Sequence, residues 1–331
     1  MHTFHFFQEL MNIPSPSGEE NQIASFLLEY LDKKGFYVEP IDVPKGSFNV
    51  YAYHGDPCVV MSTHMDTVRP LIPFSEDKRY FYGRGACDAK GILAAQVMAA
   101  EKLMEMEEKN FGLLFLVEEE SESNGARTAN KFSNTCKYLI NGEPTDNRLA
   151  LGSKGSIRLD IHVKGKAAHS AYPEQGISAI DTLISILNDL KKTRFPSHRI
   201  LGKTTMNIGV IEGGSQYNVI SDRAVAKLMF RTVTEHDQLK RKVESAVGGR
   251  GEIEYHLECQ PVFLEKVSGF DTTVVSFTTD IPNLTNWGKP FLIGPGSILD
   301  AHTSNEKISK KELSRAVELY VKLVVQLLKK C

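Results

Sequence analysis

Hydrophobic residues follow two different spacings along the chain, and together they predict an alternation of helices and strands. In one kind of segment apolar residues recur every three or four positions, which is the spacing of a helix with one buried face. In the other kind, five or six consecutive residues are mostly apolar, as in a strand buried on both faces of a sheet. The predicted helices are 21–34, 91–107 and 310–330, and the predicted buried strands are 57–62, 112–117, 137–141 and 290–294. This alternation is typical of an α/β fold with a mostly parallel sheet covered by helices.

The pattern changes in the middle of the chain, after about residue 152. Four segments there alternate apolar and polar residues, as strands do when one face is buried and the other faces water. They are 156–164, 204–211, 224–232 and 252–259, and helical spacing occurs in 177–192 and 236–247. We therefore expect a smaller α+β domain with an antiparallel sheet, inserted as residues 153–262 into a larger domain formed by 1–152 and 263–331.

Composition and charge narrow the class of protein. Of the 331 residues, 41% are hydrophobic and 24% are charged, which is typical of a soluble globular protein. Lys and Arg number 39 and Asp and Glu 41, so the chain lacks the basic excess of most nucleic-acid-binding proteins. Apolar runs such as 113–117 are too short to span a bilayer, and no signal peptide is recognisable. We expect neither nucleic acid nor a membrane as a partner.

The cysteines favour a reducing compartment. There are five of them, an odd number, they lie far apart, and no CxxC pair occurs. A disulfide framework is therefore not expected, and a cytoplasmic location fits this usage.

Imidazole and carboxylate side chains stand just after the predicted buried strands of the larger domain. Because sites in open α/β sheets form outside the carboxyl ends of the strands, these side chains should meet at one rim. A further acid, Asp88, lies in a loop bounded by glycines, 83–91. The residues that follow the strands are His64 and Asp66, then Glu118, Glu119 and Glu120, then Glu143, and finally His302.

This set of side chains favours a site for two divalent metals. Imidazole and carboxylate are the ligands expected for zinc or a similar ion. Two histidines and three carboxylates are too many for one tetrahedral zinc, but they suit two ions that share one carboxylate. A glutamate run is usually a solvated face. This run directly follows a buried strand, where adjacent carboxylates are costly without a cation.

Short motifs in a fixed order connect these residues to a known family. They are Ser62-Thr63-His64-Met65-Asp66-Thr67-Val68, Gly83-Arg84-Gly85-Ala86-Cys87-Asp88-Ala89-Lys90-Gly91, Glu119-Glu120, Gly142-Glu143-Pro144-Thr145, His169-Ser170, Gly213-Gly214 with Asn218-Val219-Ile220, Gly294-Pro295-Gly296 and Ala301-His302-Thr303. With these motifs the chain resembles the di-zinc amidohydrolase family of acetylornithine deacetylase, succinyl-diaminopimelate desuccinylase, aminoacylase and glutamate carboxypeptidase. The overall likeness is closest to acetylornithine deacetylase-like deacylases.

The resemblance implies a role for each residue of the predicted metal site. It implies that Glu119 is the general base, and then the acid that protonates the leaving amine. It also implies that Asp66 orients a ligating histidine, as such histidines usually require. The two metals would be zinc, with cobalt or manganese as alternatives. The implied ligands are His64, Asp88 and Glu143 for one ion, and Asp88, Glu120 and His302 for the other.

The resemblance also implies functions for the inserted domain, which in this family mediates dimerisation and partly covers the site. His169 looks like the residue that reaches the partner subunit's site to stabilise the oxyanion. Asn218 and Arg231 look like a substrate-binding pair, with Arg231 suited to a free α-carboxylate. Each has a structural alternative. His169 fits a helix-approach cap, Asn218 a turn after the glycines, and Arg231 a solvated strand edge.

The activity expected from the resemblance is metal-dependent hydrolysis of the amide bond of an N-acyl amino acid. The alternative enzyme is a carboxypeptidase or dipeptidase with the same metal site. A scaffold that has lost the chemistry is disfavoured, because every ligand and the base are present. We expect a small-molecule substrate and a homodimer. Neither the substrate side chain nor the acyl group follows from the sequence.

Overall fold

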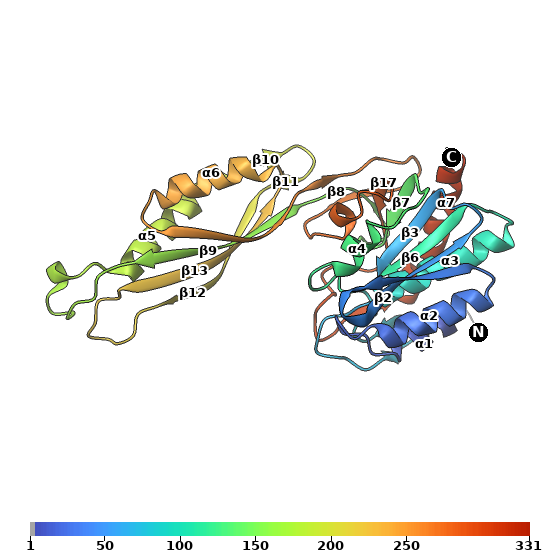
Figure 1. Ribbon diagram of the computed structural model, residues 1–331, viewed down its shortest axis with the longest axis horizontal. Helices are drawn as coiled ribbons and strands as arrows, with labels where there is room; N and C mark the ends of the chain where they lie inside the picture. The colour runs from blue at the N-terminus through green and yellow to red at the C-terminus, as the bar shows by residue number, and fades with distance from the viewer. Residues whose placement is uncertain (1–3) are drawn as a thin grey trace. The chain divides into compact units, whose positions relative to one another are not determined.

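The computed structural model describes residues 4–331 and divides the chain into two compact units (Figure 1). The larger unit contains the chain up to Leu151 together with Leu264–Thr273 and Thr279–Cys331. The inserted unit contains Gly152–Phe263 and Val274–Thr278. The chain therefore passes from the larger unit into the inserted one and returns to the larger unit at Leu264–Thr273. It then adds Val274–Thr278 to the inserted unit before Thr279–Cys331 completes the larger one.

A six-stranded sheet forms the centre of the larger unit. In spatial order its strands are β1 (Tyr37–Val43), β2 (Ser47–His54), β6 (Phe111–Leu116), β3 (Val59–His64), β7 (Tyr138–Asn141) and β17 (Lys289–Leu292). From β6 to β17 all neighbours are parallel, whereas β1, β2 and β6 pair in antiparallel fashion. The predicted α/β class with a mostly parallel sheet is confirmed, and the antiparallel edge is the part that the sequence did not reveal.

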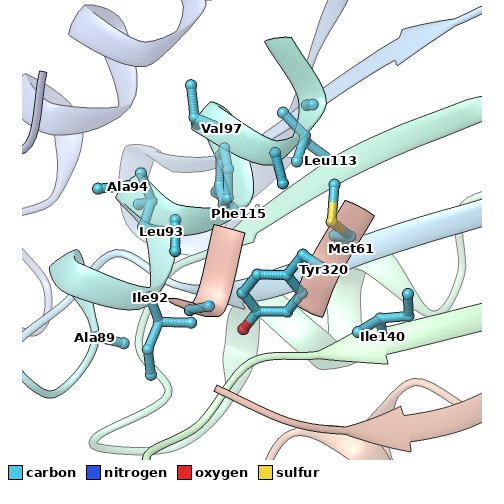
Figure 2. Close-up of a cluster of buried hydrophobic side chains, with 14 of the residues drawn as sticks. Met61, Ala89, Ile92, Leu93, Ala94, Val97, Leu113, Phe115, Ile140 and Tyr320 are labelled. Atoms are coloured by element: carbon cyan, nitrogen blue, oxygen red, sulfur yellow. The ribbon is translucent and has the colours of Figure 1, made fainter. Parts of the chain in front are cut away.

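Helices cover one face of this sheet, and a smaller cluster covers the other. The first face packs against α1 (His5–Met11), α2 (Asn21–Lys33), α3 (Lys90–Glu105) and α7 (Lys310–Leu328). Figure 2 shows Met61 and Phe115 of the sheet in this layer together with Tyr320 of α7. Val60 and Trp287 lie in the cluster on the opposite face, beside α4 (Asn124–Ala129). Since both faces are covered, successive residues such as Val60 and Met61 are both buried, and the central strands are apolar throughout.

Shorter elements complete the larger unit and its connections. A second sheet has the order β18-β5-β4, and a third has the order β15-β8-β16. These elements are β4 (Ser75–Glu76), β5 (Tyr80–Tyr82), β18 (Lys307–Ser309), β8 (Leu149–Ser153), β15 (Val262–Phe263), β16 (Thr272–Val275) and the 3-10 turns η1 (Pro44–Gly46) and η3 (Ile281–Asn283). Most are too short to show a periodic pattern, which explains why the sequence did not predict them.

The inserted unit is a four-stranded antiparallel sheet with helices on one face. The strands, in spatial order, are β12 (Thr205–Gly213), β13 (Arg223–Thr232), β9 (Gly155–Lys164) and β14 (Glu252–Cys259). The helices α5 (Ala179–Lys192) and α6 (His236–Val247) bury Leu183 and Leu239 against alternate strand residues such as Leu159 and Phe230. The minor elements are η2 (Pro173–Gln175), β10 (Ser197–His198) and β11 (Gly202–Lys203). The opposite face of the sheet carries no helix of this unit, in keeping with the alternating sequence pattern.

One disulfide corrects the expectation drawn from the cysteines. Cys58, just before β3, is bonded to Cys331, just after α7, across 273 residues of sequence. No spacing rule could pair residues so far apart. They meet because α7 packs along α3 and β3 in the larger unit. Cys87 and Cys136 are free thiols. Across residues 4–331, no helix has both the length and the apolar character needed to cross a membrane.

Candidate metal centre

The carboxyl ends of the parallel strands deliver the predicted ligands to one rim. His64 is the last residue of β3, Glu120 lies shortly after β6, and Glu143 shortly after β7. His302 follows β17 after a turn at Gly294–Gly296, and Asp88 lies just before α3. Residues that follow different strands in the sequence thereby lie close together at one edge of the sheet, as expected for an open α/β fold.

Two groups of three side chains have the spacing of metal ligands, and they share Asp88. His64, Asp88 and Glu143 form one group, and Asp88, Glu120 and His302 form the other. Asp88 points Oδ1 at Nε2 of His64, 3.0 Å away, and Oδ2 at Nε2 of His302, 3.4 Å away. Ligand atoms around a tetrahedral zinc are spaced by roughly 3.3 Å, as zinc–ligand bonds of about 2.0–2.1 Å require. The shared carboxylate is therefore placed to bridge two cations.

The electrostatics of the site fit positive charge at both positions. Oε1 of Glu143 is buried and has no hydrogen-bond partner among the described residues. Burial raises the pKa of Glu143 well above its usual range, so the carboxylate is costly here without a cation. His302 sits between Asp88 and Glu120, with Nε2 only 2.6 Å from Oε1 of Glu120. Hydrogen bonds to these two carboxylates raise the pKa of His302 to about 10. The residues present therefore fit two divalent metals that share Asp88.

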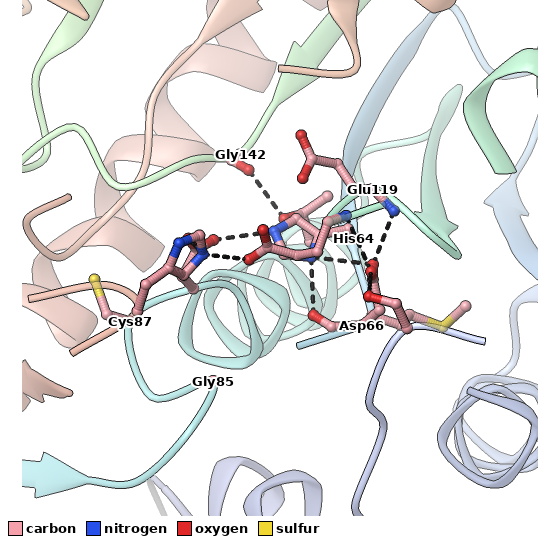
Figure 3. Close-up of polar contacts among 12 residues, drawn as sticks. His64, Asp66, Gly85, Cys87, Glu119 and Gly142 are labelled. Carbon is pink, nitrogen blue, oxygen red and sulfur yellow. Dashed lines mark hydrogen bonds and ion pairs between the residues drawn. The ribbon is translucent and has the colours of Figure 1, made fainter. Parts of the chain in front are cut away.

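Asp66 connects the ligands to the residue expected to be the base. It is fully buried, and its carboxylate accepts hydrogen bonds from the backbone N–H groups of Glu119 and Glu120 at 3.1 and 3.0 Å (Figure 3). Nδ1 of His64 lies 3.0 Å from the Asp66 carbonyl oxygen and 3.4 Å from Oδ1. Ser17 donates a further bond at 2.7 Å. Burial raises the pKa of Asp66, but these partners outweigh it and leave the pKa below its usual value.

The three adjacent glutamates have three different environments. Glu118, in a left-handed backbone conformation, accepts a 2.6 Å hydrogen bond from Asn124 and points to the start of α4. Glu120 belongs to the second ligand group. Glu119 belongs to neither group, and burial together with the charge of Glu143 raises its pKa well above the usual range. Of the three, Glu119 is therefore the carboxylate beside the ligands that remains available for proton transfer.

Glu306 holds the loop that carries Asp88, and the sequence reasoning missed it. Its Oε1 accepts hydrogen bonds from the backbone N–H groups of Gly85, Cys87 and Asp88 at 2.9–3.1 Å. Its Oε2 forms a buried ion pair with Arg84. Gly91 closes the same loop, since a Cβ there would lie 2.3 Å from the Ala86 carbonyl oxygen. The only sequence signal was one acid four residues after His302.

Asp280 is a second residue that the sequence reasoning missed. It is buried, and the hydroxyl of Ser123 lies near its carboxylate. Burial raises the pKa of Asp280 to about 7. Its charge also contributes to the raised pKa values of Glu119 and Glu143, so it extends the acidic cluster. Because it precedes a 3-10 turn in a segment without periodicity, nothing in the sequence distinguished it from a turn residue.

In the inserted unit, the structure brings together two of the three predicted residues. His169 pairs with Val219 in a β-bridge, and the backbone N–H of Ser170 donates to the carbonyl of Asn218. Both His169 and Asn218 are exposed. Asn218 lies just before β13, whereas Arg231 is eight residues beyond the first residue of that strand. Arg231 is therefore separate from this pair. Nδ1 of His169 accepts a hydrogen bond from the backbone of Ala171, which also fits the capping alternative.

Comparison with known proteins identifies the family. Residues 151–252 match the model of a peptidase dimerisation domain, M20_dimer. A peptidase M20 domain-containing protein of Schizosaccharomyces pombe is 37% identical over 96% of this chain and 83% of its own length. The chain belongs to the M20 peptidase family. It is therefore a hydrolase that acts on amide bonds.

Other M20 proteins and solved structures extend this similarity. A probable carboxypeptidase of Uncinocarpus reesii is 34% identical over 96% of the chain and 85% of its own length. A tripeptidase of Staphylococcus aureus has the same fold, with a TM-score of 0.80, 21% identity, and coverage of 97% of this chain and 96% of that one. A dinuclear metal-binding M20 peptidase of Bacillus subtilis also shares the fold, with a TM-score of 0.75, 16% identity, and coverage of 100% and 98%. The M20 fold thus accounts for both units of the chain.

Proposed function

We propose that this M20 protein is a metal-dependent exopeptidase that releases a carboxyl-terminal amino acid by hydrolysis of the preceding amide bond. The observation that carries the proposal is Asp88, which directs one oxygen to each of two ligand groups beside the unliganded carboxylate of Glu119. Relatives about one-third identical over nearly the whole chain are named probable carboxypeptidases, which favours this branch.

The mechanism follows from which residues hold the metals and which move the proton. His64, Asp88 and Glu143 would hold one divalent ion, and Asp88, Glu120 and His302 the other, with zinc the first choice for this donor set. Bound ions of this kind acidify a water molecule and stabilise negative charge on a carbonyl oxygen.

Glu119 is placed to act as base and then as acid. A carboxylate oxygen of Glu119 accepts the proton of the attacking water and later donates it to the departing nitrogen. The raised pKa of Glu119 without metals shows that the site favours its protonated form. Bound dications nearby would favour the ionised form of Glu119. Asp66 contacts both the backbone N–H of Glu119 and the ring of His64, and so fixes the position of one relative to the other.

A second candidate activity is deacylation of N-acyl amino acids, as in acetylornithine deacetylase. The likeness of motifs such as Gly142-Glu143-Pro144-Thr145 to acetylornithine deacetylase-like enzymes favours it. Glu143 alone does not distinguish the two activities, because in the resembling family a Glu at this position accompanies both deacylases and carboxypeptidases. Both reactions cleave an amide and release an amino acid with a free α-carboxylate. They differ in whether the acyl side is a peptide or a simple acid.

For the inserted unit we propose a homodimer in which His169 and Asn218 act at the site of the partner subunit. The match to a dimerisation domain supports association. Both residues are exposed, on two loops that the His169–Val219 bridge joins, and no acid pairs with the His169 ring in the described residues. Mixing His169→Ala with Glu119→Ala subunits should restore part of the activity, since one site of each heterodimer would be complete. No recovery after confirmed subunit exchange would contradict it. We also propose a cytoplasmic location; the free thiols of Cys87 and Cys136 are compatible with it, whereas the Cys58–Cys331 disulfide is evidence against it.

The experiment that tests the proposed activity is a turnover panel with zinc- and cobalt-loaded protein. It compares dipeptides and tripeptides that differ in the carboxyl-terminal residue with N-acetyl and N-succinyl amino acids. Peptides with a carboxyl-terminal amide serve as matched controls. Faster release of the terminal residue from free peptides supports the carboxypeptidase. A preference for acylated amino acids selects the deacylase, and turnover of neither class with two metals bound would refute both.

A further inference from the structure

A second cavity lies in the larger unit, with a volume of about 690 Å³. Residues 146–148, residues 269–271 and the first half of α7 form its walls, and all of them belong to that unit. None of the proposed metal ligands lines it, so the cavity is distinct from the metal centre. Its volume falls within the range of about 300–1,000 Å³ that is typical of sites for small molecules.

One side of α7 faces this cavity. Lys311, Arg315 and Leu319 all line it, and they recur every four residues, which is the spacing of neighbours on one side of a helix. Lys311 forms no ion pair within residues 4–331, and Arg315 uses Nη1 for the exposed Glu318 at 2.8 Å. Leu319 is buried, as is Phe270, which also lines the cavity. This side of the helix therefore presents two cations followed by an apolar surface.

Two carboxylates at the cavity have no cation beside them. Asp146 and Glu312 both line it, and neither forms an ion pair within the part of the chain that the structure describes. Burial of Glu312, followed by the charge of Asp146, raises the pKa of Glu312, although the backbone of Ser309 acts to lower it. Neighbouring carboxylates of this kind are stabilised by a positive charge placed next to both.

The cavity keeps its positive and negative groups apart. Its lining includes a third base, Arg148, and a third acid, Asp271. No ion pair joins any lining acid to any lining base among the described residues. Charges of both signs that balance in number but do not neutralise one another suit a ligand that itself carries both signs.

We propose that this cavity binds a free amino acid with an apolar side chain. The ammonium group of the ligand lies at Asp146 and Glu312, and its carboxylate lies at the two cations of α7. Its side chain covers the buried Phe270 and Leu319. A free amino acid carries both charges on one carbon atom, and the two sets of protein charges meet at the first turn of α7, where Lys311 and Glu312 are consecutive.

The wall of the cavity is continuous with the loops that carry two metal ligands. The backbone N–H of Asn147 donates to the Gly294 carbonyl oxygen at 2.8 Å, and its side-chain amide donates to the Glu312 carbonyl oxygen at 2.9 Å. Gly294 packs on the loop of Glu143, because a Cβ at Gly294 would lie 2.5 Å from the Glu143 carbonyl oxygen. A bound amino acid should therefore change the rate of hydrolysis. This coupling rests on the proposed function, whereas the binding does not.

The first experiment titrates L-leucine calorimetrically into the zinc-loaded, full-length protein. Lys311→Ala and Asp146→Asn should each weaken binding about tenfold, the amount expected from one charge-assisted pair at an exposed site. Asparagine tolerates the left-handed backbone of Asp146, so this variant removes the charge and keeps the conformation. Lys311→Arg should retain binding. Lys329→Ala, an exposed lysine at the end of the same helix, is the matched control and should change nothing.

Analogues of leucine test each contact of the ligand. Leucine amide lacks the carboxylate, 4-methylpentanoate lacks the ammonium group, and glycine lacks the side chain, so all three should bind about tenfold more weakly than leucine or worse. Equal affinity of leucine and 4-methylpentanoate overturns the site. Leucine binding that is the same in the wild type, Lys311→Ala and Asp146→Asn also overturns it.

Kinetics separate failure of this inference from failure of the proposed activity. At saturating peptide, leucine should change kcat of the wild type and of Lys329→Ala, but not of Lys311→Ala. The same change in Lys311→Ala would place the effect at the metal centre and overturn the coupling. Leucine binding that depends on Lys311 and Asp146 supports the site even if no peptide is cleaved, in which case only the proposed activity is wrong.

Discussion

The loop that carries the bridging Asp88 depends on one buried side chain, so replacing Glu306 by alanine is a direct test of how the metal centre is held. Glu306 is fully buried and Arg84 nearly so, and the two form an ion pair. The other carboxylate oxygen accepts three backbone N–H groups of the loop, including that of Asp88 itself. The substitution therefore leaves a buried guanidinium and three backbone donors without their acceptor.

The magnitude follows from the buried ion pair. Removal of one partner of such a pair typically costs about 3–5 kcal/mol, because the other charge stays buried and unpaired. Removal of a group that orients a metal ligand typically costs about 10- to 100-fold in metal affinity. Glu306→Gln retains an oxygen for the backbone donors but no charge for Arg84. Glu306→Gln should therefore lie between Glu306→Ala and the wild type in both the free energy of unfolding and the affinity for metal.

The assay has two parts. Urea unfolding of the metal-free proteins gives the change in the free energy of unfolding, and competition with a chelator gives the affinity for zinc. Glu19→Gln, which removes an exposed ion pair with Arg69, is the control and should cost less than about 1 kcal/mol. If Glu306→Ala destabilises the protein no more than this control and binds zinc with unchanged affinity, the reasoning about the loop is wrong.

Three further predictions concern the base, the protons of the site and the disulfide. Glu119→Gln should lower kcat by about 10²- to 10⁴-fold while metal analysis still finds both ions, and loss of an ion would instead make Glu119 a ligand. In the metal-free protein the raised pKa of His302 means that its charged form stabilises the fold. This contribution is complete below the unfolded-state pKa of about 6.5 and disappears as the pH rises through about 10. Zinc binding near pH 7.5 should therefore release a proton from His302. Calorimetry in buffers of different ionisation enthalpy measures the number of protons released on zinc binding. An equal release from His302→Ala would show that the proton does not come from His302. Cys331→Ser should lower the free energy of unfolding by about 2–4 kcal/mol, and dithiothreitol should destabilise the wild type but not the variant.

The sequence revealed those parts of the fold whose signal is local and periodic. The helices 21–34 and 310–330 appear as Asn21–Lys33 and Lys310–Leu328, because one apolar face repeats over several turns. The helix His5–Met11 was missed, since two turns are too short to show that repeat. The antiparallel edge strands Tyr37–Val43 and Ser47–His54 were also missed, because they mix polar and apolar residues without strict alternation.

The predicted metal site was accessible from the sequence because strand ends converge in this class of fold. His64 and Glu143 could be placed at one rim from their position after apolar runs alone. Glu306 and Asp280 could not, because their importance lies in burial and in partners more than 150 residues away. A buried acid in a loop looks like any other loop acid in a sequence. The pairing of Cys58 with Cys331 has the same origin, since only the packed helix brings the two thiols together.

The order of the ligands along the chain has a consequence for how the protein matures. Asp88 and Glu143 precede the inserted unit, whereas His302 follows it. During synthesis the group of His64, Asp88 and Glu143 can assemble early, but the second group lacks an imidazole until the ribosome has finished the entire insertion. A nascent chain that has not yet reached His302 therefore contains the first proposed ligand group but lacks one member of the second.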